Sequence, residues 1–118
     1  MEFQFMKDVP LDKRREQAND LLINHPNKVP IILEKDPKCK IVPINRTKYL
    51  LIKTFTINKF SKIIRSLMKI DEGEALFFLA KGKYYLLGEK TLSQIYNDYK
   101  DKKDGFLYIS YSTEMTFG

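Results

Sequence analysis

A seven-residue segment near the C-terminal end, Phe106 to Ser112, limits the folds open to this chain more than any other segment. Asp104-Gly105 precedes it as a turn signal. Successive side chains of a strand point to opposite faces, which divides its apolar residues into two sets: Phe106 with Tyr108, and Leu107 with Ile109 and Tyr111. Apolar residues on both faces indicate a central strand of a sheet that is covered on both sides.

Three segments are predicted to be helices because their apolar residues recur at helical spacing. Residues 57–68 show the firmest period, with Thr56 as a candidate N-cap. Residues 92–99 follow Thr91, a second candidate cap. Residues 11–24 form an amphipathic segment that ends at His25-Pro26.

Four further strands are expected at residues 29–34, 49–53, 75–80 and 84–87. Residues 2–8 are a short stretch of alternating apolar and polar character. The order of the predicted elements indicates a β-grasp arrangement: two strands, a helix and a strand are followed by a short helix and a central final strand. We therefore predict an α+β domain in which residues 57–68 cross one face of a mixed sheet and residues 11–24 cover the other.

Charge is distributed unevenly along the 118 residues, which are enough for one domain. Residues 1–70 carry 15 Lys and Arg against 7 Asp and Glu, a net charge of +8, and the remainder carries 6 against 8, a net charge of −2. The basic part fits acidic protein segments, anionic lipid or nucleic acid, and Tyr84 and Tyr85 keep a nucleic-acid-binding domain among the alternatives.

The sequence offers little for catalysis or metal binding. Cys39 and His25 are the only cysteine and histidine, so we expect no disulfide, zinc site or other metal site, and we predict that the chain is not an enzyme. A single cysteine is typical of a reducing compartment, and no run of 18 apolar residues or signal-peptide core is seen. A cytoplasmic location is expected.

Several stretches resemble the autophagy-related ubiquitin-like modifiers, the family that includes the GABA-receptor-associated proteins. They cover nearly the whole chain: Lys13-Arg14-Arg15, residues 26–35, Lys48-Tyr49-Leu50, Phe60 with Ile64-Arg65, residues 75–78, and residues 104–112 with Glu114 and Phe117-Gly118. The resemblance implies a ubiquitin-like β-grasp with two additional N-terminal helices. It divides the single domain 1–118 into a helical extension (1–25), a core (26–112) and a flexible tail (113–118).

The resemblance also implies conjugation of the Gly118 carboxylate to phosphatidylethanolamine by separate activating and conjugating enzymes. A glycine suits this chemistry because it lacks a Cβ and can thread a narrow channel. No cofactor is implied. The expected location is then the cytoplasm, and the autophagosome or a related vesicle membrane once the chain is lipidated. An unconjugated β-grasp scaffold is the principal alternative.

A docking surface for short aromatic-x-x-aliphatic motifs of cargo receptors and adaptors is implied as well, with the motif added as a strand at a sheet edge. The resemblance assigns the first pocket to Leu21, Pro30, Lys48, Leu50 and Phe106. It assigns the second to Tyr49, Leu51, Phe55, Phe60, Ile63 and Ile64, and polar contacts to Lys28, Arg46 and Arg65. Lys13, Arg14 and Arg15 resemble a patch that contacts the cytoskeleton in relatives.

Two positions depart from the family pattern at this docking surface. Ile52 stands where the family commonly has a proline, and Gln17 replaces an acidic residue. Both are expected to alter the selectivity for motifs.

Overall fold

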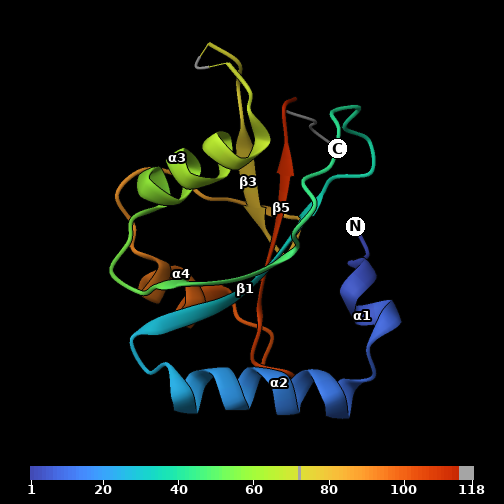
Figure 1. The fold of residues 1–118 in the computed structure, drawn as a ribbon, viewed down its shortest axis with the longest axis vertical. Coiled ribbons are helices and arrows are strands. Elements are labelled where there is room, and N and C mark those ends of the chain that lie inside the picture. The colour runs from blue at the N-terminus through green and yellow to red at the C-terminus, as the bar shows by residue number, and fades with distance from the viewer. Residues whose placement is uncertain (72, 115–118) are drawn as a thin grey trace.

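The computed structural model describes residues 1–71 and 73–114. Its helices are α1 (Gln4–Asp8), α2 (Leu11–Asn24), α3 (Ile57–Met68) and α4 (Leu92–Tyr99). Its strands are β1 (Lys28–Lys35), β2 (Lys48–Ile52), β3 (Phe77–Ala80), β4 (Tyr84–Tyr85) and β5 (Leu107–Ser112). Figure 1 shows their arrangement in space.

The strands form one mixed sheet in the order β2-β1-β5-β3-β4. β5 lies at its centre, parallel to β1 and antiparallel to β3. The two apolar faces predicted for β5 are confirmed. Phe106 and Tyr108 join a small apolar cluster beneath α1 and α2, whereas Leu107, Ile109 and Tyr111 join the larger core.

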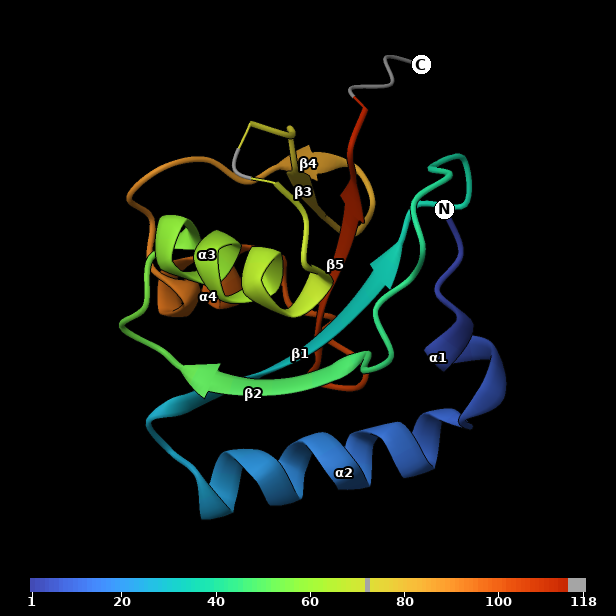
Figure 2. The same ribbon diagram turned by 45° about the horizontal axis from the view of Figure 1, so that its top comes forward.

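Helices cover both faces of this sheet, as the burial of their side chains shows. The larger core receives Ile57, Phe60 and Ile64 from α3, together with Leu92 and Ile95 from α4. On the opposite face, Ala18 of α2 packs with Ile32 and Phe106. In Figure 2, α3 and α4 lie on one side of the strands and α1 and α2 on the other.

The helix boundaries predicted at 11–24, 57–68 and 92–99 are confirmed, and the capping threonines explain two of them. The Thr56 side chain accepts a hydrogen bond from the Lys59 amide at 3.2 Å. Thr91 and Gln94 form a reciprocal capping box. β3 is shorter than predicted because it pairs only from Phe77, opposite Ser112, where β5 ends. β4 is also shorter, because only Tyr84 and Tyr85 pair with β3.

α2 approaches the turn before β5 closely, and Gly105 permits this approach. Gly105 has a φ of +88°, and a Cβ at this position would lie 3.3 Å from the Ala18 Cβ. Both the backbone conformation and the contact therefore favour glycine.

α1 adds a helix that the spacing of residues 2–8 does not reveal, although the family resemblance implies it. The Glu34 carboxylate on β1 accepts hydrogen bonds from the Gln4 and Phe5 amides, at 2.7 and 2.9 Å. These amides lie in the first turn of the helix, where no carbonyl is available to them. None of the helices in the described ranges has the length and apolar character needed to cross a bilayer.

Candidate docking site

β2 forms an edge of the sheet. It pairs antiparallel with β1, from Lys28 opposite Ile52 to Ile32 opposite Lys48, and no other described strand lies on its outer side. An edge strand with free backbone donors and acceptors can take up a further strand. The side chains of β2 alternate as predicted: Tyr49 and Leu51 pack towards the larger core, and Lys48 faces α2.

The residues predicted for the first pocket gather on the α2 side of β1 and β2. Leu21 and Leu50 are half-buried, Lys48 is exposed, and Pro30 and Phe106 are buried. Phe106 has no exposed surface at all. An incoming aromatic side chain therefore meets Leu21, Lys48 and Leu50 directly, and reaches Phe106 only if its cover moves.

That cover includes Phe5, a residue that the sequence analysis did not assign to the site. The Phe5 ring packs edge-on against Phe106, with 5.2 Å between centroids. The Lys48 Nζ lies 5.3 Å from the Phe5 centroid and donates a hydrogen bond to Gln17 Oε1 at 2.7 Å. Phe5 thus lies between two residues of the predicted first pocket. Its only sequence signal is an aromatic side chain in the short segment before α2.

The residues predicted for the second pocket lie between β2 and α3, at two depths. Phe60 and Ile64 have no exposed surface, and Tyr49 is only 5% exposed, so these three belong to the core. Leu51, Phe55 and Ile63 are half-buried and form the accessible surface. Leu67, 53% exposed and one helical turn after Ile63 on α3, extends this apolar surface beyond the predicted set. Ile52, 38% exposed, has the parity of Lys48 and Leu50 and so lies on the other face of β2.

The three predicted polar contacts do not form one cluster. Lys28 pairs with Ile52 at the end of β2, whereas Arg46 precedes its start and places its guanidinium 5.8 Å from the Tyr49 ring centroid. Arg65 donates to the Glu74 carbonyl at 2.6 Å and so links α3 to the segment before β3. Lys28 and Arg46 therefore border opposite ends of the open strand.

Comparison with known proteins places this architecture in a family. The model described as "Autophagy protein Atg8 ubiquitin like" matches residues 13–118. The chain belongs to the Atg8 family of ubiquitin-like autophagy proteins. The predicted family and ubiquitin-like fold are thereby confirmed.

Relatives within the Atg8 family match over most of their lengths. The chain is 40% identical to Autophagy-related protein 8 of Dictyostelium discoideum over 114 residues, which cover 97% of this chain and 93% of that protein. It is 36% identical to human microtubule-associated protein 1 light chain 3 gamma over 106 residues, covering 89% and 71% of the two. The crystal structure of Trypanosoma brucei ATG8 superposes with a TM-score of 0.90 at 30% identity, over the whole of both chains.

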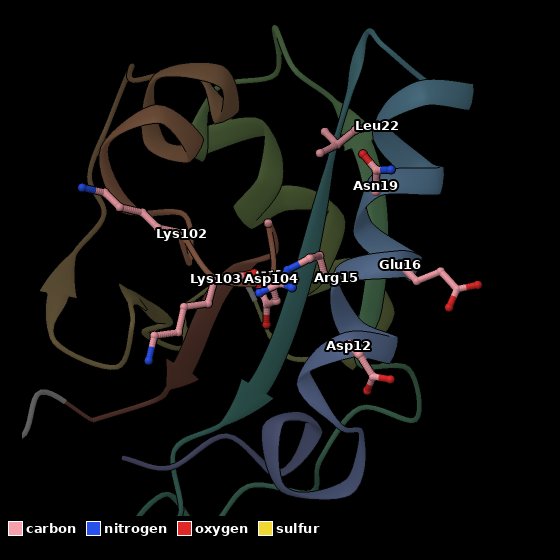
Figure 3. Close-up of a pocket in the computed structure, with 9 residues that line it drawn as sticks. Asp12, Arg15, Glu16, Asn19, Leu22, Lys102, Lys103 and Asp104 are labelled. Carbon is pink, nitrogen blue, oxygen red and sulfur yellow. Dashed lines mark hydrogen bonds between the residues drawn. The ribbon is translucent and has the colours of Figure 1, made fainter.

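The basic patch expected at Lys13, Arg14 and Arg15 does not form one surface. The expectation is wrong for Arg14, whose side chain is directed into the domain. Arg14 turns inward to the buried Asp104, with its Nε 2.9 Å from Oδ2. Arg15 donates to the Lys103 carbonyl at 3.0 Å. Figure 3 shows Arg15 directed at this loop, across a cavity of about 570 Å³ between α2 and residues 102–105. Lys13 is exposed and lies 3.8 Å from Glu16.

Asp104 is the centre of a buried polar network. Besides Arg14, its carboxylate accepts hydrogen bonds from the Phe106 amide at 2.8 Å and the Tyr108 hydroxyl at 2.5 Å. Burial, the hydrogen bond to Asp104 and the negative charge of that carboxylate raise the pKa of Tyr108 far above its usual range. This network secures the start of β5.

The two tyrosines that suggested a nucleic-acid-binding domain pack against other aromatic rings of the domain. Tyr84 stacks on Tyr99 with ring centroids 5.1 Å apart and 21° between their planes, so one ring face is already covered. Tyr85 lies edge-on to Phe77. Base stacking needs an accessible ring face, and Tyr84, 48% exposed, has at most one such face left.

The predicted conjugation residue, Gly118, lies outside the described residues. Five positions earlier in the sequence, the Thr113 Oγ1 lies 3.4 Å from the Cys39 Sγ. β5 and this contact hold the chain in place as far as Thr113 and so fix where the tail begins.

Proposed function

We propose that this Atg8-family chain is a modifier whose Gly118 carboxylate is joined to the amine of phosphatidylethanolamine, and that it then recruits motif-bearing partners to autophagosomal membranes. The observation that carries the recruiting role is the open edge of β2, with accessible apolar surface on both of its faces. Residues three apart in an added strand point to opposite faces, and the two surfaces lie on opposite faces of β2.

In the proposed docking, the backbone of the partner motif pairs with the outer edge of β2. The aromatic side chain enters beside Leu21, Lys48 and Leu50, and the aliphatic side chain packs between Leu51, Phe55 and Ile63. Backbone hydrogen bonds supply affinity that depends little on sequence, and the two apolar contacts supply selectivity. Lys28 and Arg46 attract acidic residues that flank the motif, mainly by speeding encounter.

The proposed conjugation makes the chain a substrate of other enzymes, and its own residues perform no catalysis. ATP converts the Gly118 carboxylate into an adenylate and releases pyrophosphate. An enzyme thiolate displaces AMP to form a thioester, and the lipid amine then displaces the thiol to form an amide. The chain contributes a narrow glycine end and a folded domain that the activating and conjugating enzymes can recognise.

The proposal includes the expected location and reduces the number of basic residues available for a cytoskeletal contact. The chain acts in the cytoplasm until lipidation fixes it to a vesicle membrane. A cytoskeletal partner at the N-terminal helices would meet Lys13 and Arg15 on the surface, since Arg14 is ion-paired inside the domain.

Calorimetric titration with an acid-flanked Trp-x-x-Leu peptide tests the docking. Leu50→Ala and Ile63→Ala each remove one apolar contact and are expected to weaken binding about tenfold. Leu87→Ala is the matched control, because Leu87 is 74% exposed between β4 and α4. Equal affinity of all three variants would contradict docking at β2. No binding by the unmodified chain would leave conjugation as the only proposed activity.

A further inference from the structure

The loop between β1 and β2 presents an apolar side chain that the fold does not use. Val42 is 81% exposed, the highest value among the large hydrophobic residues of the described chain. Its neighbours Ile41 and Ile44 pack against the larger core, and Pro43 is exposed beside it. The loop is therefore anchored on both sides of a protruding tip.

Basic side chains flank this tip. Lys38, Lys40 and Arg46 are exposed, and no carboxylate of the described residues forms a salt bridge with any of them. Within residues 36–46, Asp36 is the only acidic residue against three basic ones, which gives the loop a net charge of +2. One oxygen of Asp36 already accepts the Lys38 amide at 2.9 Å.

Internal contacts hold the loop in this shape. The Lys35 Nζ turns inward and donates to the carbonyls of Asp36 and Cys39. The Cys39 amide donates to the Asp36 carbonyl at 3.0 Å. The position of the tip is thus set by the domain and does not depend on a partner.

The loop lies beside the base of the C-terminal tail. The Asp36 amide donates to the Tyr111 carbonyl at 2.9 Å, and the Ile44 amide to the Tyr111 hydroxyl at 3.0 Å. Figures 1 and 2 both place the loop next to the end of β5 and far from α2. The Cα atoms of Thr113 and Gly118 are five residue steps apart, a distance of at most about 18 Å. A lipid attached at Gly118 therefore keeps the loop near the bilayer.

We propose that this loop, residues 36–46, is a membrane contact that inserts the Val42 tip among the headgroups of an anionic bilayer and so orients the tethered domain. The inference rests on the proposed function, which supplies the tether. An apolar tip with basic flanks combines the two attractions that bind peripheral proteins to membranes. Each basic residue near an anionic surface increases partitioning roughly fivefold. With α2 turned away from the bilayer, the open edge of β2 stays accessible.

Tryptophan fluorescence tests this contact, since the chain contains no tryptophan. Val42→Trp is introduced into the full chain, which carries a C-terminal histidine tag that binds nickel-chelating lipids. Brominated lipids in vesicles rich in phosphatidylserine quench a tryptophan that enters the bilayer. Ile23→Trp is the matched control, because Ile23 is 67% exposed on α2. The tag replaces enzymatic conjugation, so failure of lipidation would leave this result unaffected.

Quenching is expected to be at least about twofold stronger at position 42 than at position 23 on anionic vesicles. Because tryptophan itself favours membrane interfaces, Lys38→Glu with Lys40→Glu is compared in the Val42→Trp background. This pair, or 1 M salt, is expected to lower the quenching to the level at position 23. Equal quenching at the two positions would overturn the proposal. Strong quenching that persists after charge reversal, or on neutral vesicles, would also overturn it.

Discussion

Arg14 and Asp104 form an ion pair that joins α2 to the turn before β5, with 2.9 Å between the Arg14 Nε and the Asp104 Oδ2. The Asp104 side chain has no exposed surface, and that of Arg14 is 12% exposed. Arg14 also donates to the carbonyls of Met6 and Val9, at the end of α1 and just beyond it. One arginine thus connects both N-terminal helices to the central strand of the sheet.

Arg14→Met is expected to lower the free energy of unfolding by about 3 kcal/mol, because it leaves a buried carboxylate without its cation. Lys13→Met, at a position whose side chain is 64% exposed, is expected to change it by less than about 0.5 kcal/mol. Urea unfolding followed by circular dichroism measures both. Similar losses in the two variants would mean that the inward contacts of Arg14 do not carry the stability.

Stability is expected to fall above about pH 10, the usual pKa of tyrosine. Burial raises the pKa of Tyr49, Tyr96, Tyr108 and Tyr111, so the folded chain keeps protons that the unfolded chain releases at that pH. The stabilisation is complete below pH 10, and each tyrosine removes up to about 1.4 kcal/mol per pH unit above it. Urea unfolding between pH 8 and 11 measures this effect, and Tyr108→Phe is expected to reduce the slope. A constant free energy of unfolding over this range would contradict the burial of these hydroxyls.

Phe5→Ala is expected to strengthen binding of an aromatic-x-x-aliphatic peptide several-fold. The Phe5 ring covers Phe106, so a peptide that uses the full depth of the first pocket must displace it, and this requirement lowers the apparent affinity. Gln4→Ala, on the neighbouring exposed residue, is the control. Calorimetry with one peptide compares the variants. Weaker binding by Phe5→Ala would show instead that Phe5 is a wall of the pocket.

The sequence correctly predicts those helices and strands whose apolar spacing and capping residues lie within the element itself. The α3 helix has a regular apolar stripe and a threonine cap, and its predicted bounds of 57–68 match the structure. The central position of β5 follows from its two apolar faces. α1 has only five residues, too few to show a period, and it is held by the carboxylate of Glu34, about thirty residues away.

Which residues of the candidate site are buried and which are accessible could not be predicted in the same way. Phe60 and Ile63 belong to one apolar stripe, yet the first is buried and the second is half-exposed. Phe60 packs on Phe78 of β3, a contact that the spacing within α3 does not reveal. Arg14 looks like its exposed neighbours until the fold brings Asp104 beside it from 90 residues away. Both outcomes depend on contacts between distant segments.

The most direct test of the central claim is the intact mass of the chain after conjugation in vitro. The chain ending at Gly118 is incubated with activating and conjugating enzymes, ATP and phosphatidylethanolamine vesicles, beside a relative on which the same enzymes act. The account predicts that the chain gains the mass of one lipid less one water and partitions with the vesicles, and that a form lacking Gly118 does neither. An unchanged mass while the relative is lipidated, or equal modification without Gly118, would contradict conjugation through this glycine.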